Sequence, residues 1–244
     1  MPAPRLARLS GAAFTRVALG CLWLVAWLPW SWQRGLAAAF GAFAFHVVRI
    51  RRHVVLVNLR VCFPELTVSA RHTLARRHYQ SLALGILEVA RCWWRPPAAL
   101  PPCRIDGVEA LEKALATGRG VLLVSGHFTT LEIAGRMLAL RTPICCLYRD
   151  PNNPVLADLL RKHRTAWANR AIEMRDMSGL MRALRDGEAV WYAPDQGKWT
   201  PQSAVLPFFG RPAITNLSTS RLAKMSGAAV FTFFPAAKRT ALTC

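Results

Sequence analysis

The sequence predicts an α/β fold with a mixed, largely parallel sheet flanked by helices, preceded by an N-terminal helical membrane-anchor region. Two observations carry this prediction. Beyond residue 101, short runs of β-branched and other apolar residues alternate with amphipathic segments of helical period. Before residue 50, long apolar stretches contain almost no charge. A chain of 244 residues has room for one substantial domain and an anchor.

A cluster of prolines suggests where the two parts meet. Pro96, Pro97, Pro101 and Pro102 interrupt every regular pattern within seven residues. We therefore expect an anchor region with amphipathic helices at 1–100 and an α/β core at 101–244.

The first apolar stretch, 17–33, carries no charge and follows a short basic lead over residues 1–16. A spanning helix usually needs about 20 apolar residues, so this stretch is at the short end. Pro29 interrupts it, which leaves a half-inserted interfacial hairpin as an alternative to a transmembrane helix. A cleaved signal peptide is disfavoured, because no clear small-residue cleavage site precedes a polar start.

Three further segments complete the anchor region. A second apolar run covers 35–48, and 49–63 has the pattern of a basic amphipathic helix. Such a helix either lies on anionic headgroups or packs as an ordinary helix. The long segment 68–94 is expected to be a helix that begins at Thr67 or Ser69 and closes on two tryptophans.

The core elements follow from the alternation of apolar runs and amphipathic segments. Glycine follows several helical segments, where it suits a C-cap, and Pro154 suits the first turn of a helix. Strands are expected at 121–125, 143–148, 171–174, 188–193 and 228–234, and helices at 107–116, 129–140, from Pro154 onward, at 178–186 and at 213–226.

The overall charge limits the classes of partner. The formal net charge is +19, and 53% of the residues are hydrophobic. An apolar but strongly basic chain suggests a membrane surface or a polyanionic partner. Specific nucleic-acid binding is disfavoured, because there is no helix-turn-helix, zinc-finger or RNA-recognition signature.

The cysteines indicate the redox compartment. There are seven, an odd number, and no two have the CxxC spacing. Most lie in apolar runs, where a free cysteine behaves as a small hydrophobic residue. We expect a reducing compartment, and no metal site, because no zinc-ligand spacing is present.

The most informative stretch follows the strand expected at 121–125. His127 comes directly after a Ser-Gly break, and Glu132 lies five residues later at the start of a helical segment. A carboxylate that reaches back to one imidazole nitrogen would leave the other free to take a proton from a hydroxyl. The alternative is a capping box in which Thr129 and Glu132 only close the helix start. The spacing alone leaves both interpretations open.

Other segments fall in an order that is similar to a known family. Together with the stretch around His127 and Glu132, they cover roughly residues 17–235 and resemble the lipid A biosynthesis (late) acyltransferases, a branch of the lysophospholipid acyltransferase superfamily. The matching segments are Asn58-Leu59-x-x-Cys62-Phe63-Pro64-Glu65, Tyr148-Arg149-x-Pro151-Asn152-Asn153-Pro154, Ala193-Pro194-Asp195-Gln196, Pro207-Phe208-Phe209-Gly210-x-Pro212-Ala213 and Thr219-Ser220-Arg221-Leu222-Ala223-Lys224-Met225-Ser226-Gly227-Ala228.

The resemblance implies a reaction and its residues. An acyl chain would pass from an acyl carrier protein thioester to a hydroxyl of a lipid A precursor. His127 would act as the general base, with Glu132 holding it. Arg149 would bind a phosphate of the substrate or stabilise developing charge, with a surface salt bridge as the alternative. Asp195 would orient substrate or support the histidine–arginine network, with a turn-forming residue as the alternative. No metal or organic cofactor is implied.

The resemblance also implies a location and leaves alternatives. It places the chain at the bacterial inner membrane with the catalytic domain facing the cytoplasm. The same residues would serve another lipid acceptor, such as a phospholipid, glycolipid or ornithine lipid. An inactive basic membrane-binding protein is the remaining alternative.

Family members usually run further, so we expect the core at 101–244 to be C-terminally truncated. The segment 208–210 suits either an acyl-chain wall or plain core packing.

Overall fold

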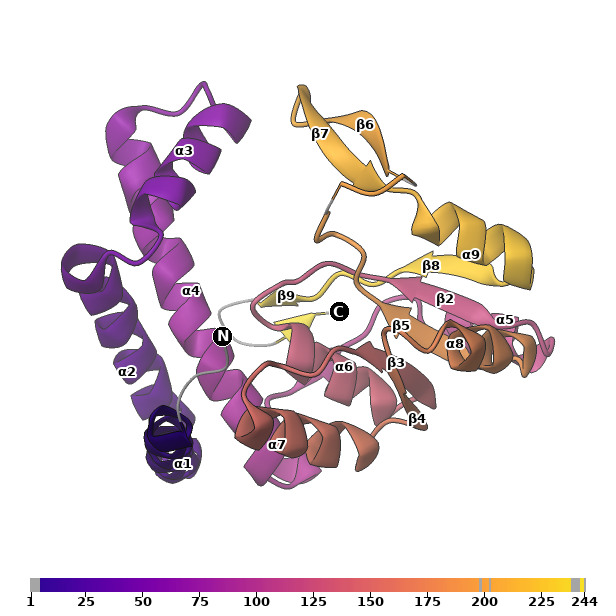
Figure 1. The fold of residues 1–244 in the computed structure, drawn as a ribbon, viewed down its shortest axis with the longest axis horizontal. Helices are drawn as coiled ribbons and strands as arrows, with labels where there is room; N and C mark the ends of the chain where they lie inside the picture. Colours follow the sequence, from indigo (N-terminus) through magenta and orange to yellow (C-terminus); the bar gives the residue numbers. More distant parts are fainter. Residues whose placement is uncertain (1–4, 198, 202, 238–241, 244) are drawn as a thin grey trace.

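The computed structural model describes residues 5–197, 199–201, 203–237 and 242–243. A layer of helices, α1 to α4, stands beside an α/β unit that contains the remaining elements (Figure 1). The predictions made for the start of the basic lead and for the last residues of the chain fall partly outside the described residues.

A five-stranded sheet forms the centre of the α/β unit. Its strand order is β4-β3-β5-β2-β8, and every neighbouring pair is parallel. This confirms the predicted α/β class. The strands are β2 (Val121–Val124), β3 (Ile144–Tyr148), β4 (Arg170–Glu173), β5 (Ala189–Tyr192) and β8 (Ala229–Thr232).

Helices cover both faces of this sheet. On one face α5 and α6 pack on side chains that include Leu123 and Trp191, while on the other α8 and α9 pack on Leu122 and Val190. Successive strand residues are thus buried on opposite faces, which is why these strands are continuously apolar in sequence. The helices of the unit are α5 (Val108–Ala116), α6 (Leu131–Ala139), α7 (Pro154–Thr165), α8 (Met177–Arg185) and α9 (Ser218–Ser226).

A β-hairpin replaces the first part of the helix that was predicted at 213–226. β6 (Ser203–Phe208) and β7 (Arg211–Asn216) pair antiparallel, and the helix begins only at Ser218. The two turn residues, Phe209 and Gly210, have φ angles of 51° and 68°. Positive φ at both central positions is the turn that matches the twist of a hairpin. The prediction for 213–217 was therefore wrong, since the turn and the pairing with β6 override the helical pattern.

Short elements complete the described part of the α/β unit. β1 (Cys103–Arg104) pairs parallel with β10 (Leu242–Thr243), which pairs antiparallel with β9 (Ala236–Ala237). A single 3₁₀ turn, η2 (Pro97–Ala99), lies in the proline cluster between the helical layer and this unit.

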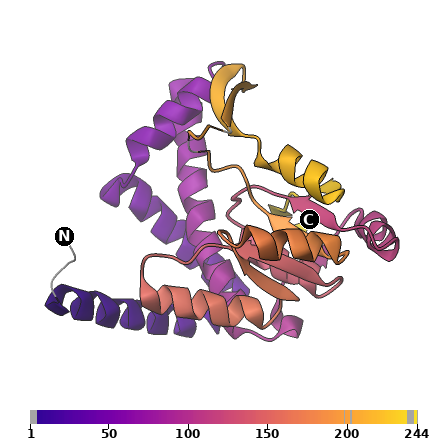
Figure 2. The same ribbon diagram turned by 45° about the vertical axis from the view of Figure 1, so that its right-hand side comes forward.

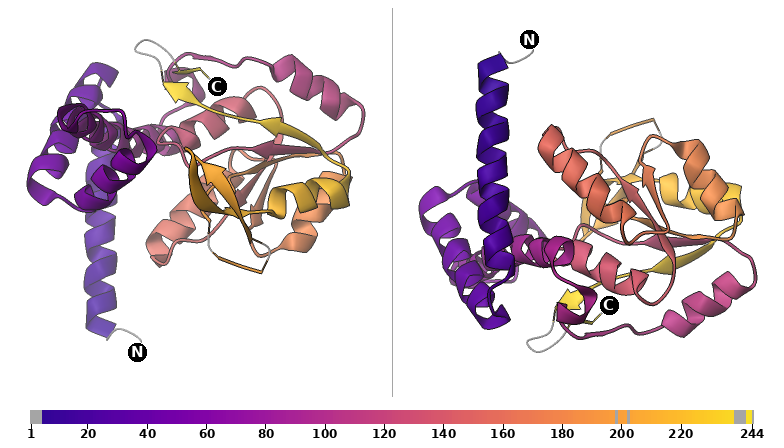
Figure 3. Two further views of the ribbon diagram at one scale, coloured as in Figure 1. Left: turned by 90° about the horizontal axis from the view of Figure 1, so that it is seen from above. Right: turned by 90° about the horizontal axis from the view of Figure 1, so that it is seen from below.

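The helical layer is built on one long helix. α4 (Val68–Trp94) begins with the Thr67 hydroxyl accepting a hydrogen bond from the Ala70 N–H, so the prediction for 68–94 is confirmed. α2 (Trp30–Phe43), the π-helical turn η1 (Ala44–Val48) and α3 (Arg52–Cys62) pack along it. α1 (Arg5–Ala26) contacts α4 and extends beside α7 of the α/β unit (Figures 2 and 3). The Asn153 side chain, at the start of α7, donates a hydrogen bond to the Thr15 hydroxyl of α1 at 2.9 Å.

The first apolar stretch is divided between two helices. α1 ends at Ala26 and α2 starts after Pro29, with the wholly buried Gln33 donating hydrogen bonds to the carbonyls of Ala26 (3.1 Å) and Leu28 (2.9 Å). The side chain thus satisfies carbonyls that the helix break leaves without partners. Among the helices of the described residues, none combines the length and the hydropathy needed to cross a bilayer.

Close packing of α2 on α4 gives a matched pair of stability predictions. A Cβ at Gly41 would overlap backbone atoms of Gln80, whereas a Cβ at Gly35 in the same helix would meet nothing within 4 Å. Gly41→Ala should lower the free energy of unfolding by about 1–3 kcal/mol through overpacking. Gly35→Ala should raise it by about 0.5–1 kcal/mol, because alanine favours the helix. Denaturant unfolding checks both signs; equal effects would show that α2 does not approach α4 this closely.

Candidate active site

The sheet brings two predicted site residues together. Val124 of β2 is paired in register with Tyr192 of β5, and both strands run in the same direction. His127 lies three residues beyond the first, and Asp195 lies three residues beyond the second. The ladder extends one step further, with the Ser125 N–H bonded to the Tyr192 carbonyl at 2.8 Å. The two side chains therefore meet at the carboxyl edge of the sheet, where active sites of open α/β folds lie.

Asp195 holds His127 at two points. Its Oδ1 lies 2.5 Å from the imidazole Nδ1, and its Oδ2 accepts the backbone N–H of His127 at 2.7 Å. The side chains are 43% and 44% exposed. The carboxylate thus fixes both the ring and the backbone that carries it, while solvent still reaches the pair.

The same bonds set the protonation state of the carboxylate. Burial tends to raise the pKa of Asp195, but the hydrogen bonds from the backbone and ring of His127 outweigh it and lower that pKa below its usual value. Asp195 is therefore ionised at neutral pH, which suits a group that stabilises a positively charged imidazole.

The sequence spacing left open a contact between Glu132 and His127, and the structure does not form it. Glu132 lies in the first turn of α6 and points to α7, where both of its oxygens accept bonds from Arg164, Oε2 from Nη2 at 2.7 Å and Oε1 from Nε at 3.3 Å. The pair is buried, with side-chain exposures of 8% for Glu132 and 13% for Arg164. His127 stays in the loop before the helix, so its carboxylate partner comes from another strand.

The capping box that competed with the catalytic interpretation is not formed either. Thr130, not Thr129, occupies the N-cap position of α6, and its side chain makes no capping bond. The Thr129 hydroxyl lies 2.8 Å from the Ser81 hydroxyl of α4. The loop that carries His127 is thus tied to the helical layer.

α4 approaches this loop closely. A Cβ at Gly85 would lie 2.5 Å from the Thr129 carbonyl oxygen, so only glycine permits the observed spacing. Ser81 and Gly85 are one turn apart and face the same loop. α4 therefore supports the segment that positions His127.

Arg149 lies where it was predicted, directly after a core strand of the sheet. It directly follows β3, which is separated from β2 by β5, or roughly 10 Å at the usual strand spacing. The residue is exposed, and within the described residues no hydrogen bond or ion pair involves its side chain. A free guanidinium at this edge is available to an anionic group of a substrate.

Comparisons with known proteins identify the family of this chain. The family profile described as bacterial lipid A biosynthesis acyltransferase matches residues 5–242. The chain belongs to this family. It is 32% identical over 226 residues to the lipid A biosynthesis lauroyltransferase of Escherichia coli K12, covering 92% of this chain and 74% of the relative. It is also 32% identical over 219 residues to the palmitoleoyltransferase of the same organism, covering 88% and 71%.

A more distant relative has the same kind of name. A lipid A biosynthesis acyltransferase of Haemophilus influenzae is 28% identical over 188 residues, which is 76% of this chain and 60% of that protein. The family relationship makes this chain an acyltransferase.

Arg164, the partner of Glu132 beside the candidate site, is a residue that sequence reasoning missed. It lies in the last turn of α7, in a run of three basic residues, and 32 positions separate it from Glu132. Basic residues are common at helix C-termini, where they complement the helix dipole, so the sequence does not distinguish a buried partner from a surface one.

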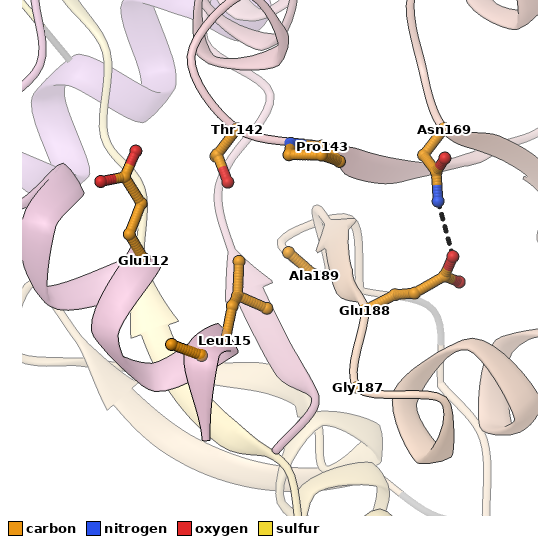
Figure 4. A pocket seen from close by; sticks show the side chains of 9 residues that line it. Glu112, Leu115, Thr142, Pro143, Asn169, Gly187, Glu188 and Ala189 are labelled. Atoms are coloured by element: carbon orange, nitrogen blue, oxygen red, sulfur yellow. Dashed lines mark hydrogen bonds between the residues drawn. The ribbon is translucent and has the colours of Figure 1, made fainter. Parts of the chain in front are cut away.

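A pocket of about 350 Å³ lies at the opposite edge of the sheet (Figure 4). Pro143 and Ala189, at the amino ends of β3 and β5, contribute to its lining. Glu188 in this pocket accepts a hydrogen bond from the Asn169 side chain at 2.6 Å. Because His127 and Asp195 follow the carboxyl ends of the strands, this pocket is not part of the candidate active site.

Proposed function

We propose that this acyltransferase moves a fatty acyl chain from an acyl carrier protein thioester to a hydroxyl of a lipid A precursor, with His127 as the general base. The observation that supports this best is the two-point bond between Asp195 and His127. It occupies Nδ1 and leaves Nε2, in an exposed position, for the hydroxyl proton. The names of the E. coli relatives, a lauroyltransferase and a palmitoleoyltransferase, support a fatty acyl group.

The proposed step needs no covalent acyl-enzyme. Nε2 of His127 takes the proton of the acceptor hydroxyl while the oxygen attacks the thioester carbonyl carbon. The tetrahedral state then breaks its C–S bond, and the imidazolium returns the proton to the departing thiolate. Asp195 stabilises the imidazolium between these two events.

The developing negative charge on the carbonyl oxygen needs hydrogen-bond donors. The backbone N–H groups of Thr129 and Thr130 lie just before α6, and no acceptor for them occurs within the described residues. Backbone donors at a helix start are suited to an oxyanion. Arg149, at the same edge of the sheet, would bind a phosphate of either substrate.

Glu132 has a different role in this proposal from the one the family motif suggested. With Arg164 it joins α6 to α7, and α6 directly follows the loop that carries His127. Glu132 is then a positioning residue for the site, and Asp195 is the partner of the imidazole.

The basic and apolar surface suits the proposed substrates and location. An acyl carrier protein is acidic and the lipid A precursor is phosphorylated, so a net charge of +19 favours the approach of both. Large apolar side chains are exposed on the helical layer, and they would let residues 1–100 rest on the inner membrane. Examples are Phe14, Trp23, Trp27, Trp32, Phe40 and Phe43. The α/β core would then lie on the cytoplasmic side of that membrane.

The experiment that tests the proposal is acyl transfer in detergent. Purified protein is incubated with labelled acyl-acyl carrier protein and a tetra-acylated lipid A precursor, and the products are separated by chromatography. Product confirms donor and acceptor together. If the lipid A precursor gives no acylated product but a lysophospholipid, glycolipid or ornithine lipid does, the proposed acceptor is wrong and the acyl-transfer reaction is supported. No product with any acceptor contradicts the proposed activity.

Asp195→Asn tests which carboxylate serves His127. An asparagine keeps the size of the side chain but cannot stabilise an imidazolium, so kcat should fall by about 10²-fold or more with KM unchanged. The folded-state pKa of Asp195 is lowered, so its contribution to stability is present above the usual carboxyl pKa and is lost as the pH falls through the folded-state value. Unfolding measurements should therefore show wild type and variant converging in acid. Unchanged kcat would remove Asp195 from the mechanism.

A further inference from the structure

A second pocket lies between the helical layer and the β6–β7 hairpin. It has a volume of about 390 Å³ and is lined mainly by apolar side chains. The aromatic rings of Phe63 and Phe209 meet in it, with centroids 5.1 Å apart, so the tip of the hairpin contacts the end of α3. The lining includes Val55, Leu59, Phe63, Leu74, His78 and Phe209.

This pocket and the His127 loop lie along the same face of α4. Leu74 and His78 line the pocket, while Ser81 and Gly85 contact Thr129, two residues beyond His127. The spacings of four, three and four residues place all four on one stripe of the helix. The seven residues from His78 to Gly85 span about 10 Å along the helix axis. The pocket is therefore a short distance from the candidate reaction centre.

We propose that this pocket holds the far part of the acyl chain that is being transferred, and that its walls set the preferred chain length. The inference rests on the proposed function. Apolar walls and a volume of this size suit several methylene groups of a hydrocarbon chain and offer little to a charged group.

The donor chain is the occupant that the geometry favours. Its carbonyl carbon must lie beside His127 for attack, so the chain starts at a known point and can extend along α4 into the pocket. Leu82, which is 43% exposed and one turn from His78, provides apolar surface between the two. The chains of an acceptor start from other positions on its headgroup and have no such constraint.

The test changes the pocket in both directions. Leu74→Phe narrows the pocket, and Phe209→Ala widens it. Position 209 has a positive φ, which phenylalanine and alanine adopt at a similar cost because both carry a Cβ. Val61→Phe, on an exposed part of α3 outside the pocket, is the control. Transfer rates are measured with saturated donors from octanoyl to palmitoyl, each at low concentration so that kcat/KM is compared.

We expect opposite shifts from the two variants. Leu74→Phe should lower the ratio of long-chain to short-chain kcat/KM by about tenfold, as expected when two buried methylenes are excluded, and Phe209→Ala should raise the ratio. Val61→Phe should leave it unchanged. Equal effects on all chain lengths, or a shift in the control, would overturn the assignment of the pocket.

A second measurement does not depend on turnover. Cys62 lines the pocket, and Cys21 is exposed on α1. A dodecyl thioether of pantetheine, which cannot transfer its chain, should slow alkylation of Cys62 about tenfold in peptide mapping and leave Cys21 unchanged. Unaltered alkylation of Cys62 at saturating thioether would contradict the proposal, whereas an inactive wild type with Cys62 protected would contradict only the proposed acceptor chemistry.

Discussion

Replacing His127 with alanine is expected to lower kcat/KM for acyl transfer by about 10²- to 10⁴-fold. The structure fixes the imidazole at this edge through Asp195, a carboxylate that follows the neighbouring strand β5. Without the imidazole the acceptor hydroxyl keeps its proton and is a weak nucleophile. Single-turnover measurements with labelled acyl-acyl carrier protein report the chemical step directly.

The fold should tolerate this change. The His127 side chain is 43% exposed and lies in a loop, so its loss leaves no cavity in the core. His53→Ala, at an exposed histidine of α3, is the matched control and should keep full activity. Equal rates for wild type and His127→Ala would show that His127 is not the base.

The second large effect is on stability and concerns Glu132 and Arg164. Arg164→Met leaves a buried carboxylate without its partner, and Glu132→Leu leaves a buried guanidinium without its own. Each single change should lower the free energy of unfolding by about 3–5 kcal/mol. The double variant should cost far less than the sum, because an apolar pair of similar volume avoids the desolvation of both charges.

Denaturant unfolding of the four proteins gives the coupling energy. The exposed ion pair of Arg104 with Asp106 provides a control, since solvent screens it and its removal should have little effect. Additive losses for Glu132 and Arg164 would mean that the two side chains do not form a buried pair. Residual transfer activity in the double variant would show that this pair supports the site without taking part in the reaction.

The placement of the candidate site residues at one edge of the sheet could be predicted from the sequence. His127, Arg149 and Asp195 each follow an apolar run that forms a parallel strand, and the carboxyl ends of parallel strands share one edge. The start of α4 at Thr67 and of α7 at Pro154 could also be predicted, because their capping signals are local.

The sequence left the partners within the candidate site undecided: support of the histidine was one of two roles open to Asp195, and Glu132 was the expected partner. Glu132 is close to His127 in sequence, but the loop and the first turn of α6 direct it to α7. Asp195 is 68 residues from His127 in sequence, and only the pairing of β2 with β5 brings it near. The hairpin at 203–216 was missed for a similar reason, because cross-strand pairing decides its structure.

The long helix α4 has a consequence for how the protein can be divided. Its C-terminal end contributes Cys92 to the core that α5 and α6 form on the sheet, and its middle supports Thr129 beside His127. A fragment that starts at the predicted boundary, residue 101, would expose that core and release the loop of the candidate base. Because α4 packs against α2 and α3 on one side and Thr129 on the other, a shift of the helical layer would be transmitted to the loop of the candidate base.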